Sequence, residues 1–146
     1  MPDNTEKNEH VVGVDFGGTK ILAGVFNSKF DCVGRARVST KADRGADEVI
    51  GRIARCISEA VDECDLELKQ ISAVGIGAPG AVDSESGKVI FAPNLGWNDV
   101  PLKKELEKEL VKELVKELEK KLKKKPEKGL SLLTYLYIFL IVFPKF

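Results

Sequence analysis

Two adjacent glycines between two short apolar runs constrain this chain more than any other feature. The runs are Val11–Asp15 and Ile21–Phe26, and residues 15–20 between them read Asp-Phe-Gly-Gly-Thr-Lys. Glycine enters tight turns without steric cost, so this pattern predicts a strand, a glycine turn and a second strand. It is neither a Walker A loop nor a dinucleotide-binding fingerprint, because both of those place a helix directly after the glycines.

Further elements follow the predicted hairpin. Cys32–Thr40 fits a third strand, and 46–64 carries apolar residues at helical spacing. Ile71–Ala78 reads as a buried strand, and Val89–Phe91 as a short one before the loop 92–99. This order of strands and helices predicts an α/β layer architecture with a mixed sheet.

Length and composition narrow the class of protein. The 146 residues correspond to about one domain, and 43% hydrophobic with 32% charged residues argues against wholesale disorder and against a polytopic membrane protein. The 23 basic and 23 acidic residues cancel, but the first hundred residues are acidic and the next segment is basic. Nucleic-acid binding is therefore not expected, because it needs clustered basic residues on the folded face.

The cysteines and the single histidine predict neither a metal site nor secretion. Cys32, Cys56 and Cys64 form no CxxC pair, and His10 stands alone near a polar N-terminus that lacks an apolar signal region. An odd number of cysteines without a signal peptide favours reduced thiols and a cytoplasmic location.

A Lys-Glu-Leu repeat begins at Lys104 and predicts a long amphipathic helix over about 101–125. Pro101 suits the first turn, Asp99 is the candidate N-cap, and Pro126 ends the helix. Its length, about 37 Å at 1.5 Å per residue, exceeds the sheet of a small domain. We therefore expect its far half to project, with its Leu and Val stripe seeking a partner.

The segment Leu130–Phe143 contains no charge. As a helix it would span about 21 Å, short of the roughly 30 Å hydrocarbon core of a bilayer, so a transmembrane span is disfavoured. Its aromatic and β-branched residues also suit a strand or an aggregating segment. We expect it to be helical or poorly ordered and not paired in parallel beside Ile71–Ala78, because the long helix carries the chain beyond the edge of the sheet.

The glycine turn has the chemistry of a phosphate clamp. Its backbone N–H groups can approach an anion closely, Thr19 adds a hydroxyl, and Asp15 adds a carboxylate able to hold hydrated Mg²⁺. The alternative is a hairpin turn in which the glycines serve geometry alone.

Three ordered motifs extend this interpretation: Val11–Lys20 followed by Gly24, then Gly75–Gly80, then Pro93–Trp97. Together they resemble the N-terminal lobe of the ROK family of sugar kinases and repressors, especially its glucokinases. The resemblance implies the ribonuclease H-like fold shared by sugar kinases, Hsp70 and actin. It divides the chain into a polar segment 1–9, the lobe 10–110, a helical extension 111–129 and an apolar tail 130–146.

The resemblance also implies roles for individual residues. Asp15 would contact the Mg²⁺ that accompanies ATP, and Gly80 would face a hexose such as glucose. For Trp97 the alternative is a loop anchor in the core. The full set comprises Asp15, Gly17, Gly18, Thr19 and Lys20 toward the ATP phosphates, and Gly80, Asn94, Gly96 and Trp97 toward the sugar.

The sequence departs from the family after Leu110. There the family continues into a strand and an Asn-Asp-Ala segment whose Asp is the general base, whereas here Val111 begins another repeat. Neither the family's cysteine-rich zinc motif nor its second lobe follows. The remaining loop carboxylates, Asp83 and Asp99, fit turn or cap roles, so no catalytic residue is assigned. We expect an incomplete, catalytically impaired lobe; the alternative is an interaction protein that self-associates or contacts a membrane surface through 111–146.

Overall fold

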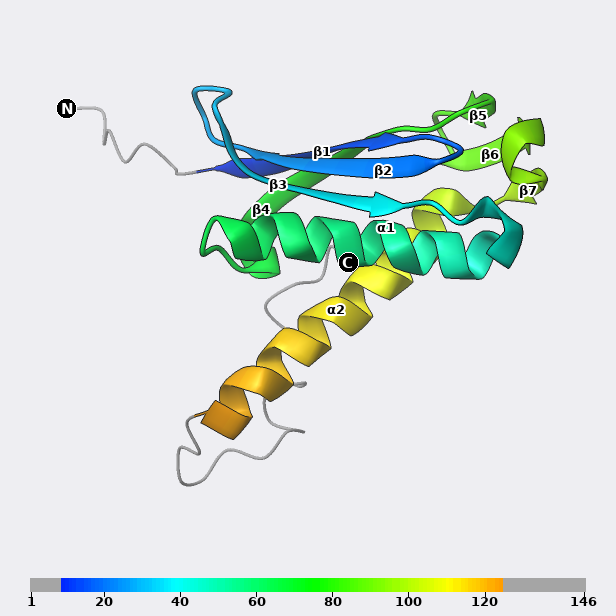
Figure 1. Cartoon of the computed structure of the whole chain (residues 1–146). Helices are drawn as coiled ribbons and strands as arrows, with labels where there is room; N and C mark the ends of the chain where they lie inside the picture. Colours follow the sequence, from blue (N-terminus) through cyan, green and yellow to red (C-terminus); the bar gives the residue numbers. More distant parts are fainter. Residues whose placement is uncertain (1–8, 125–146) are drawn as a thin grey trace.

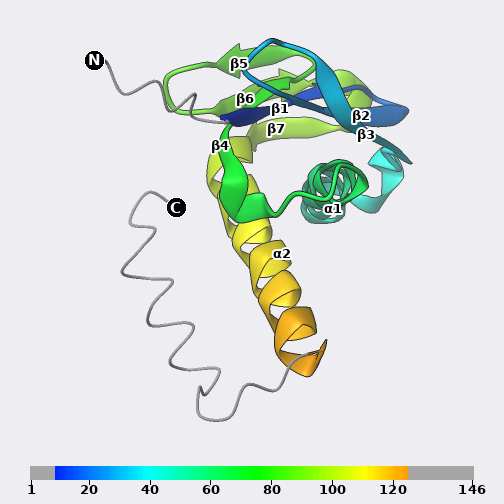
Figure 2. The same ribbon diagram turned by 90° about the vertical axis from the view of Figure 1, so that its left-hand side faces the viewer.

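The computed structural model describes residues 9–124, so the apolar tail and nearly all of the polar N-terminal segment lie outside the described residues. A four-stranded sheet forms one layer, one helix lies along one of its faces, and a second helix starts on the same side, packs on the first and runs away from the sheet (Figures 1 and 2). A second sheet of three short strands follows. The strands are β1 (His10–Phe16), β2 (Lys20–Phe26), β3 (Cys32–Ser39), β4 (Ile71–Gly77), β5 (Ala81–Asp83), β6 (Lys88–Ala92) and β7 (Trp97–Val100), and the helices are α1 (Ala46–Glu63) and α2 (Leu102–Lys124), with 3₁₀ turns η1 (Ala42–Arg44), η2 (Leu68–Gln70) and η3 (Pro93–Leu95).

The larger sheet has the order β3-β2-β1-β4 and is mixed, as predicted. β1 and β2 form the antiparallel hairpin around the glycine turn, with Phe16 opposite Ile21. β4 lies parallel to β1, with Asp15 opposite Gly77. The predicted α/β architecture with a mixed sheet is therefore confirmed.

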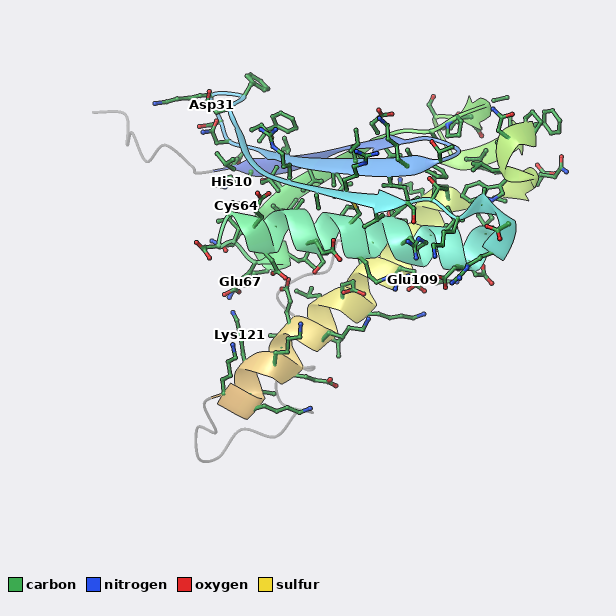
Figure 3. The ribbon with its side chains drawn as sticks, viewed as in Figure 1. His10, Asp31, Cys64, Glu67, Glu109 and Lys121 are labelled. Carbon is green, nitrogen blue, oxygen red and sulfur yellow. The ribbon has the colours of Figure 1, made fainter. Side chains whose placement is uncertain are left out.

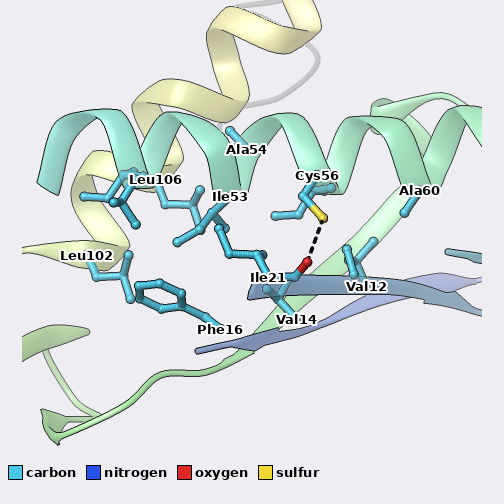
Figure 4. Close-up of a cluster of buried hydrophobic side chains, with 14 of the residues drawn as sticks. Val12, Val14, Phe16, Ile21, Ile53, Ala54, Cys56, Ala60, Leu102 and Leu106 are labelled. Atoms are coloured by element: carbon cyan, nitrogen blue, oxygen red, sulfur yellow. Dashed lines mark hydrogen bonds between the residues drawn. The ribbon is translucent and has the colours of Figure 1, made fainter. Parts of the chain in front are cut away.

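The core lies between this sheet and α1. Ile53 and Ile57 of α1 are fully buried, and Phe16 of β1 reaches toward Leu102 and Leu106 of α2 (Figure 4). Cys56 also faces the sheet, and its thiol donates to the carbonyl of Ile21 at 3.7 Å. Burial, with the nearby Glu59 carboxylate, raises the pKa of the Cys56 thiol to about 11, so this cysteine is a packing residue and not a nucleophile.

Three local predictions need correction. The segment 92–99, predicted as a loop, contains η3 and the start of β7, and β5 was not predicted at all. Asp99 does not cap α2: the helix begins at Leu102, and Glu105 N–H donates to the Pro101 carbonyl at 3.0 Å. Asp99 instead has a φ of 50° and lies 3.8 Å from the Lys88 ammonium. Strands of three or four residues lack the period that would reveal them in sequence.

The far half of α2 runs away from the larger sheet, as Figures 1 and 2 show, but it keeps contacts with the rest of the lobe. The helix continues without a break through residue 110, Leu106 and Leu114 are buried, and the Leu68 N–H donates to a Glu117 oxygen at 3.4 Å. One turn later Lys121 forms an ion pair with Glu67, and the two side chains point toward each other in Figure 3. Burial of its apolar stripe therefore holds α2 mainly against α1, and two polar contacts join its far half to η2.

No helix in residues 9–124 combines the length and the apolar run needed to cross a membrane.

Gly34 marks the closest approach of β3 to α1 and gives a first testable prediction. A Cβ added there would overlap the Ala60 carbonyl oxygen and lie 2.9 Å from the Cys64 sulfur. Gly34→Ala should therefore lower the free energy of unfolding by about 1–3 kcal/mol through overpacking. Gly75→Ala is the control, because nothing lies within 4 Å of the added atom. Urea unfolding of both variants measures the difference, and equal midpoints would contradict the close packing.

Glu117 gives a second prediction. Burial raises the pKa of its carboxyl, and one oxygen is buried without a hydrogen-bond partner in the described residues. Because this carboxyl has a higher pKa in the folded protein than in the unfolded chain, its protonation stabilises the fold. This contribution is fully present below the ordinary glutamate pKa, about 4.3, and is lost as the pH rises. Glu117→Gln should therefore stabilise the fold at pH 7–8 by about 1 kcal/mol.

This gain should shrink below about pH 4, where the natural carboxyl is itself protonated. Glu107→Gln, at an exposed position of the same helix, provides the control and should change stability little at either pH. Thermal melts of the three proteins across this range test the point. A gain for Glu117→Gln that is independent of pH would contradict the titration argument.

Candidate functional site

The predicted site residues gather where the strands of the larger sheet end. β1 and β4 are parallel, so their carboxyl ends meet there, with Asp15 paired to Gly77. The glycine turn 17–19 follows β1, and the turn 78–80 follows β4. In α/β sheets, ligands bind beyond the carboxyl ends of the strands, which makes this edge the candidate site.

The glycine turn is fixed by a residue that the sequence analysis did not single out. The Thr40 side chain is fully buried and its hydroxyl donates to the Gly17 carbonyl at 2.6 Å. The Thr40 N–H donates to the Thr19 carbonyl at 2.9 Å, and the Gly17 N–H donates to the Lys20 carbonyl at 3.0 Å. In the sequence, Thr40 is only a polar residue at the end of a predicted strand. Such residues are too common to indicate this role.

The amides of Gly18 and Thr19 are left for a ligand. No hydrogen bond engages either of them within residues 9–124, whereas the Gly17 N–H is used inside the turn. Gly18 is half-buried, and Thr19 is exposed. Backbone N–H groups without an internal hydrogen bond can donate to a phosphate oxygen.

Gly18 lies directly beside Asn94, although 76 positions separate them in the sequence. A Cβ added to Gly18 would stand 3.7 Å from the Asn94 Cβ, in ordinary van der Waals contact. The structure thus brings together the segment predicted to contact phosphates and the segment predicted to contact sugar. Asn94 is exposed in η3 and offers both a donor and an acceptor to a hydroxyl.

Two glycines shape the loops around Asn94. Gly80 has a φ of 90°, and a Cβ there would overlap the Phe91 carbonyl oxygen and lie 2.9 Å from the Ala92 Cα. Gly96 has a φ of 65°, and its N–H donates to the Pro93 carbonyl at 3.0 Å, which ends η3. The left-handed conformation at both positions favours glycine, and the bare backbone of Gly80 lets its turn pack against the end of β6.

Trp97 lies in the core and not at the mouth of the site. Its side chain is 2% exposed, and its ring stands 5.4 Å from the Phe16 ring at an interplanar angle of 47°. The indole N–H has no hydrogen-bond partner among the described residues. This position cannot offer an aromatic face to a sugar, so the geometry favours the loop-anchor alternative.

The polar residues of the glycine turn face solvent. Asp15, Thr19 and Lys20 are all exposed. Residues 9–124 hold no group of three His, Cys, Asp or Glu side chains arranged for a metal ion. Asp15 could supply one oxygen to Mg²⁺, and that is sufficient where the nucleotide supplies others, because Mg²⁺ commonly binds through one or two carboxylates plus substrate phosphates.

Asp83 takes the turn role expected from the sequence. One of its oxygens accepts the Glu85 N–H at 3.1 Å and the other accepts the Ser86 hydroxyl at 2.6 Å. These hydrogen bonds lower the pKa of the Asp83 carboxyl, the Ser86 hydroxyl contributing most. An ionised carboxylate engaged in its own turn is a poor general base.

Comparison with known proteins is consistent with this arrangement. The model of the ROK family matches residues 11–123, well over half of the chain. The chain belongs to the ROK family. The glucokinase of Thermotoga maritima is 37% identical over 97 residues, which are 66% of this chain and 29% of that protein. The xylose repressor of Caldicellulosiruptor bescii is 29% identical over 93 residues, 64% of this chain and 23% of that protein.

Solved structures give the same picture for this ROK lobe. A ROK glucokinase from Streptomyces griseus, in complex with glucose and AMPPNP, superposes with a TM-score of 0.60 at 36% identity, over 70% of this chain and 30% of that one. The fold is therefore that of the sugar kinase, Hsp70 and actin superfamily. The chain spans less than a third of the length of the curated relatives described above.

Thr40 gives the third prediction. Thr40→Val keeps the shape but leaves the Gly17 carbonyl without its donor, so the protein should lose about 1–2 kcal/mol of stability. The exchange of the Gly18 and Thr19 amides should speed up as the turn loosens. Thr40→Ser is the matched control because it retains the hydroxyl. Thermal melts and amide exchange measure both effects, and unchanged exchange in Thr40→Val would show that the turn does not need this hydrogen bond.

Proposed function

We propose that this chain carries the phosphate-binding and sugar-binding half of a ROK sugar kinase site, whose reaction passes the γ-phosphoryl of ATP to a sugar hydroxyl. The observation that carries the proposal is the contact between Gly18 and Asn94. Phosphoryl transfer depends mainly on holding donor and acceptor side by side, and this contact joins a phosphate-type turn to a hydroxyl-binding side chain.

On the nucleotide side, the amides of Gly18 and Thr19 would receive a phosphate oxygen, and the Thr19 hydroxyl would add a third donor. Asp15 would hold Mg²⁺ from the exposed end of β1, and Lys20 would add positive charge at the same edge. Magnesium would neutralise charge on the transferring phosphoryl group. The rigid turn, with Gly17 bonded to Lys20 and Thr40, would keep these donors in place without reorganisation.

On the sugar side, Asn94 would bind hydroxyls of a hexose such as glucose, and the turn at Gly80 would form the adjacent wall. Gly96 would fix the backbone conformation with which the chain leaves η3. Trp97 would act indirectly, because its packing on Phe16 holds η3 at its distance from the glycine turn. The names of the relatives, glucokinases among them, support a hexose as substrate and ATP as donor. A cytoplasmic location belongs to the same proposal.

The chain is not expected to turn over by itself. None of its 146 residues forms an Asn-Asp-Ala segment, which supplies the general base in the family. Residues 9–124 also present no second set of elements opposite the glycine turn that would hold adenine. A site with donors for two substrates but without a proton acceptor or an opposing wall is expected to bind weakly and not to transfer.

Calorimetry with ATP and Mg²⁺, together with a coupled assay with glucose, tests this proposal. Weak nucleotide binding is expected, with glucose-dependent ATP consumption at background. Gly18→Val should reduce ATP affinity at least tenfold, because its side chain stands where the phosphates approach, while its Cβ would make only ordinary van der Waals contact with Asn94.

Gly75→Val serves as the matched control for Gly18→Val, since it lies in β4 with nothing within 4 Å of the added Cβ, and it should bind ATP unchanged. Equal affinity in both variants would show that the turn is merely structural. Robust turnover that disappears in Asp15→Ala would overturn the expected lack of activity.

A further inference from the structure

The far half of α2 is attached to the lobe mainly through polar side chains. Leu114 is the last buried residue of the helix as far as Lys124, where the described part of the chain ends. Beyond it, the Leu68 N–H of η2 donates to a Glu117 oxygen at 3.4 Å, and Lys121 forms an ion pair with Glu67 at the start of η2. The docking of this half therefore depends on the ionisation of two carboxyl groups more than on apolar burial.

Glu117 occupies an unfavourable place for a negative charge. One of its oxygens accepts the Leu68 N–H, and the other is buried without a hydrogen-bond partner among residues 9–124. Burial is the main cause that raises the pKa of the Glu117 carboxyl, and the charges of Asp62 of α1 and Glu67 raise it further. Lys121 acts in the opposite direction, but its ammonium is paired with Glu67. Docking therefore favours the protonated form of Glu117.

Glu67 has the opposite environment. Its carboxylate pairs with Lys121 of α2 and lies 3.0 Å from the Lys69 ammonium of η2. Figure 3 shows the Glu67 and Lys121 side chains pointing toward each other. The hydrogen bond from Lys121 is the main cause that lowers the pKa of the Glu67 carboxyl, and Lys69 lowers it further. Undocking separates Glu67 from Lys121 but not from Lys69, so docking favours the ionised form of Glu67.

We propose that η2 and the far half of α2 form a proton-controlled latch, which is closed most tightly at about pH 4–5 and loosens at both higher and lower pH. The moving part is the segment after Leu114. The near half of the helix stays in place, because Leu102 and Leu106 are buried in the core. Two carboxyl groups with opposite preferences at one contact give that contact an optimum of pH.

The two groups act on opposite sides of the optimum. Undocking exposes Glu117, whose pKa then returns toward the ordinary glutamate value of about 4.3. Its contribution to docking is fully present below that value and is lost as the pH rises through the raised pKa. The contribution of Glu67 is fully present above the ordinary value and is lost as the pH falls through the lowered pKa. Docking is therefore weaker at neutral pH than in moderately acidic solution.

Amide hydrogen exchange by NMR on the full chain, measured from about pH 3.5 to about pH 8, tests the latch. The reporter is the Leu68 N–H, which donates to Glu117 in the closed state. Its protection factor corrects for the intrinsic effect of pH on exchange. This factor should be highest at about pH 4–5 and fall about threefold or more by neutral pH. The amides of β1 and β2 should keep their protection, which distinguishes undocking from unfolding of the lobe.

Two variants separate the two sides of the optimum. Glu117→Gln keeps an acceptor for the Leu68 N–H but cannot ionise, so the loss of protection toward neutral pH should disappear while the loss toward low pH remains. Lys121→Gln removes the cation that undocking separates from Glu67, so only the loss toward low pH should disappear. Glu107→Gln, at an exposed position of the near half, is the matched control and should leave the whole profile unchanged.

A protection factor of the Leu68 amide that stays constant across this range in the natural protein would overturn the proposal. A profile that Glu117→Gln leaves unchanged would do the same, because another group would then control the contact. Parallel loss of protection in β1 and β2 would assign the effect to unfolding of the whole lobe and would also overturn it. Carbon NMR titration of the Glu117 carboxyl gives an independent check, and a pKa at or below the ordinary glutamate value would contradict the latch.

Discussion

The site of this ROK lobe depends on one aromatic contact, the packing of Trp97 on Phe16. Phe16 is the last residue of β1 and directly precedes the glycine turn, while Trp97 is the first residue of β7 and directly follows η3. Their rings are 5.4 Å apart in the buried core. Because the two residues adjoin the two turns of the candidate site, their contact helps to fix the position of Gly18 relative to Asn94. Aromatic pairs of this kind are among the stronger side-chain contacts available to a small core.

Backbone hydrogen bonds and one glycine also hold the turns of the candidate site in place. Gly17 is tied to Lys20 and to Thr40, so the turn after β1 is braced from the hairpin and from the end of β3. Gly80, with its positive φ, brings the turn after β4 against the residues that precede η3. Three segments distant in sequence thus converge at the carboxyl ends of two parallel strands. The side chains at the mouth are few, so the site relies on backbone donors and one amide, which suits anion and hydroxyl recognition.

The side of β4 that faces away from β1 has no partner strand within residues 9–124. There the structure joins an uncharged edge strand to the apolar face of α2, and Leu106 and Leu114 are buried although the helix is built from a charged repeat. In the Glu–Lys pairs at three-residue spacing the lysines are exposed while the glutamates are partly covered, and ion pairs with one exposed partner contribute little to stability. The Leu positions determine how the helix sits, and the charged positions mainly keep its outer face hydrated. Contacts with Gly87 near the start of α2 and with Leu68 in its last third fix the position of the helix.

The sequence by itself determined the local elements and the family. Hydrophobic periodicity and glycine placement located β1 to β4 and both helices to within a residue or two, because these elements are long enough to show their period. The motifs at 15–20, 75–80 and 93–97 indicated the ROK lobe, and the family model matches residues 11–123. Short strands such as β5 and β7 carry no such signal, and they were missed.

Only the tertiary structure decided how these pieces act together. Thr40 braces the glycine turn through a hydrogen bond across 23 positions, and Gly18 meets Asn94 across a much longer interval. Trp97 turns inward because β7 pairs with β6 and places the indole under Phe16, a choice that composition cannot reveal. The path of α2 likewise depends on which of its leucines are buried in the core. Local propensity is a property of neighbouring residues, whereas burial and convergence depend on the packing of the whole chain.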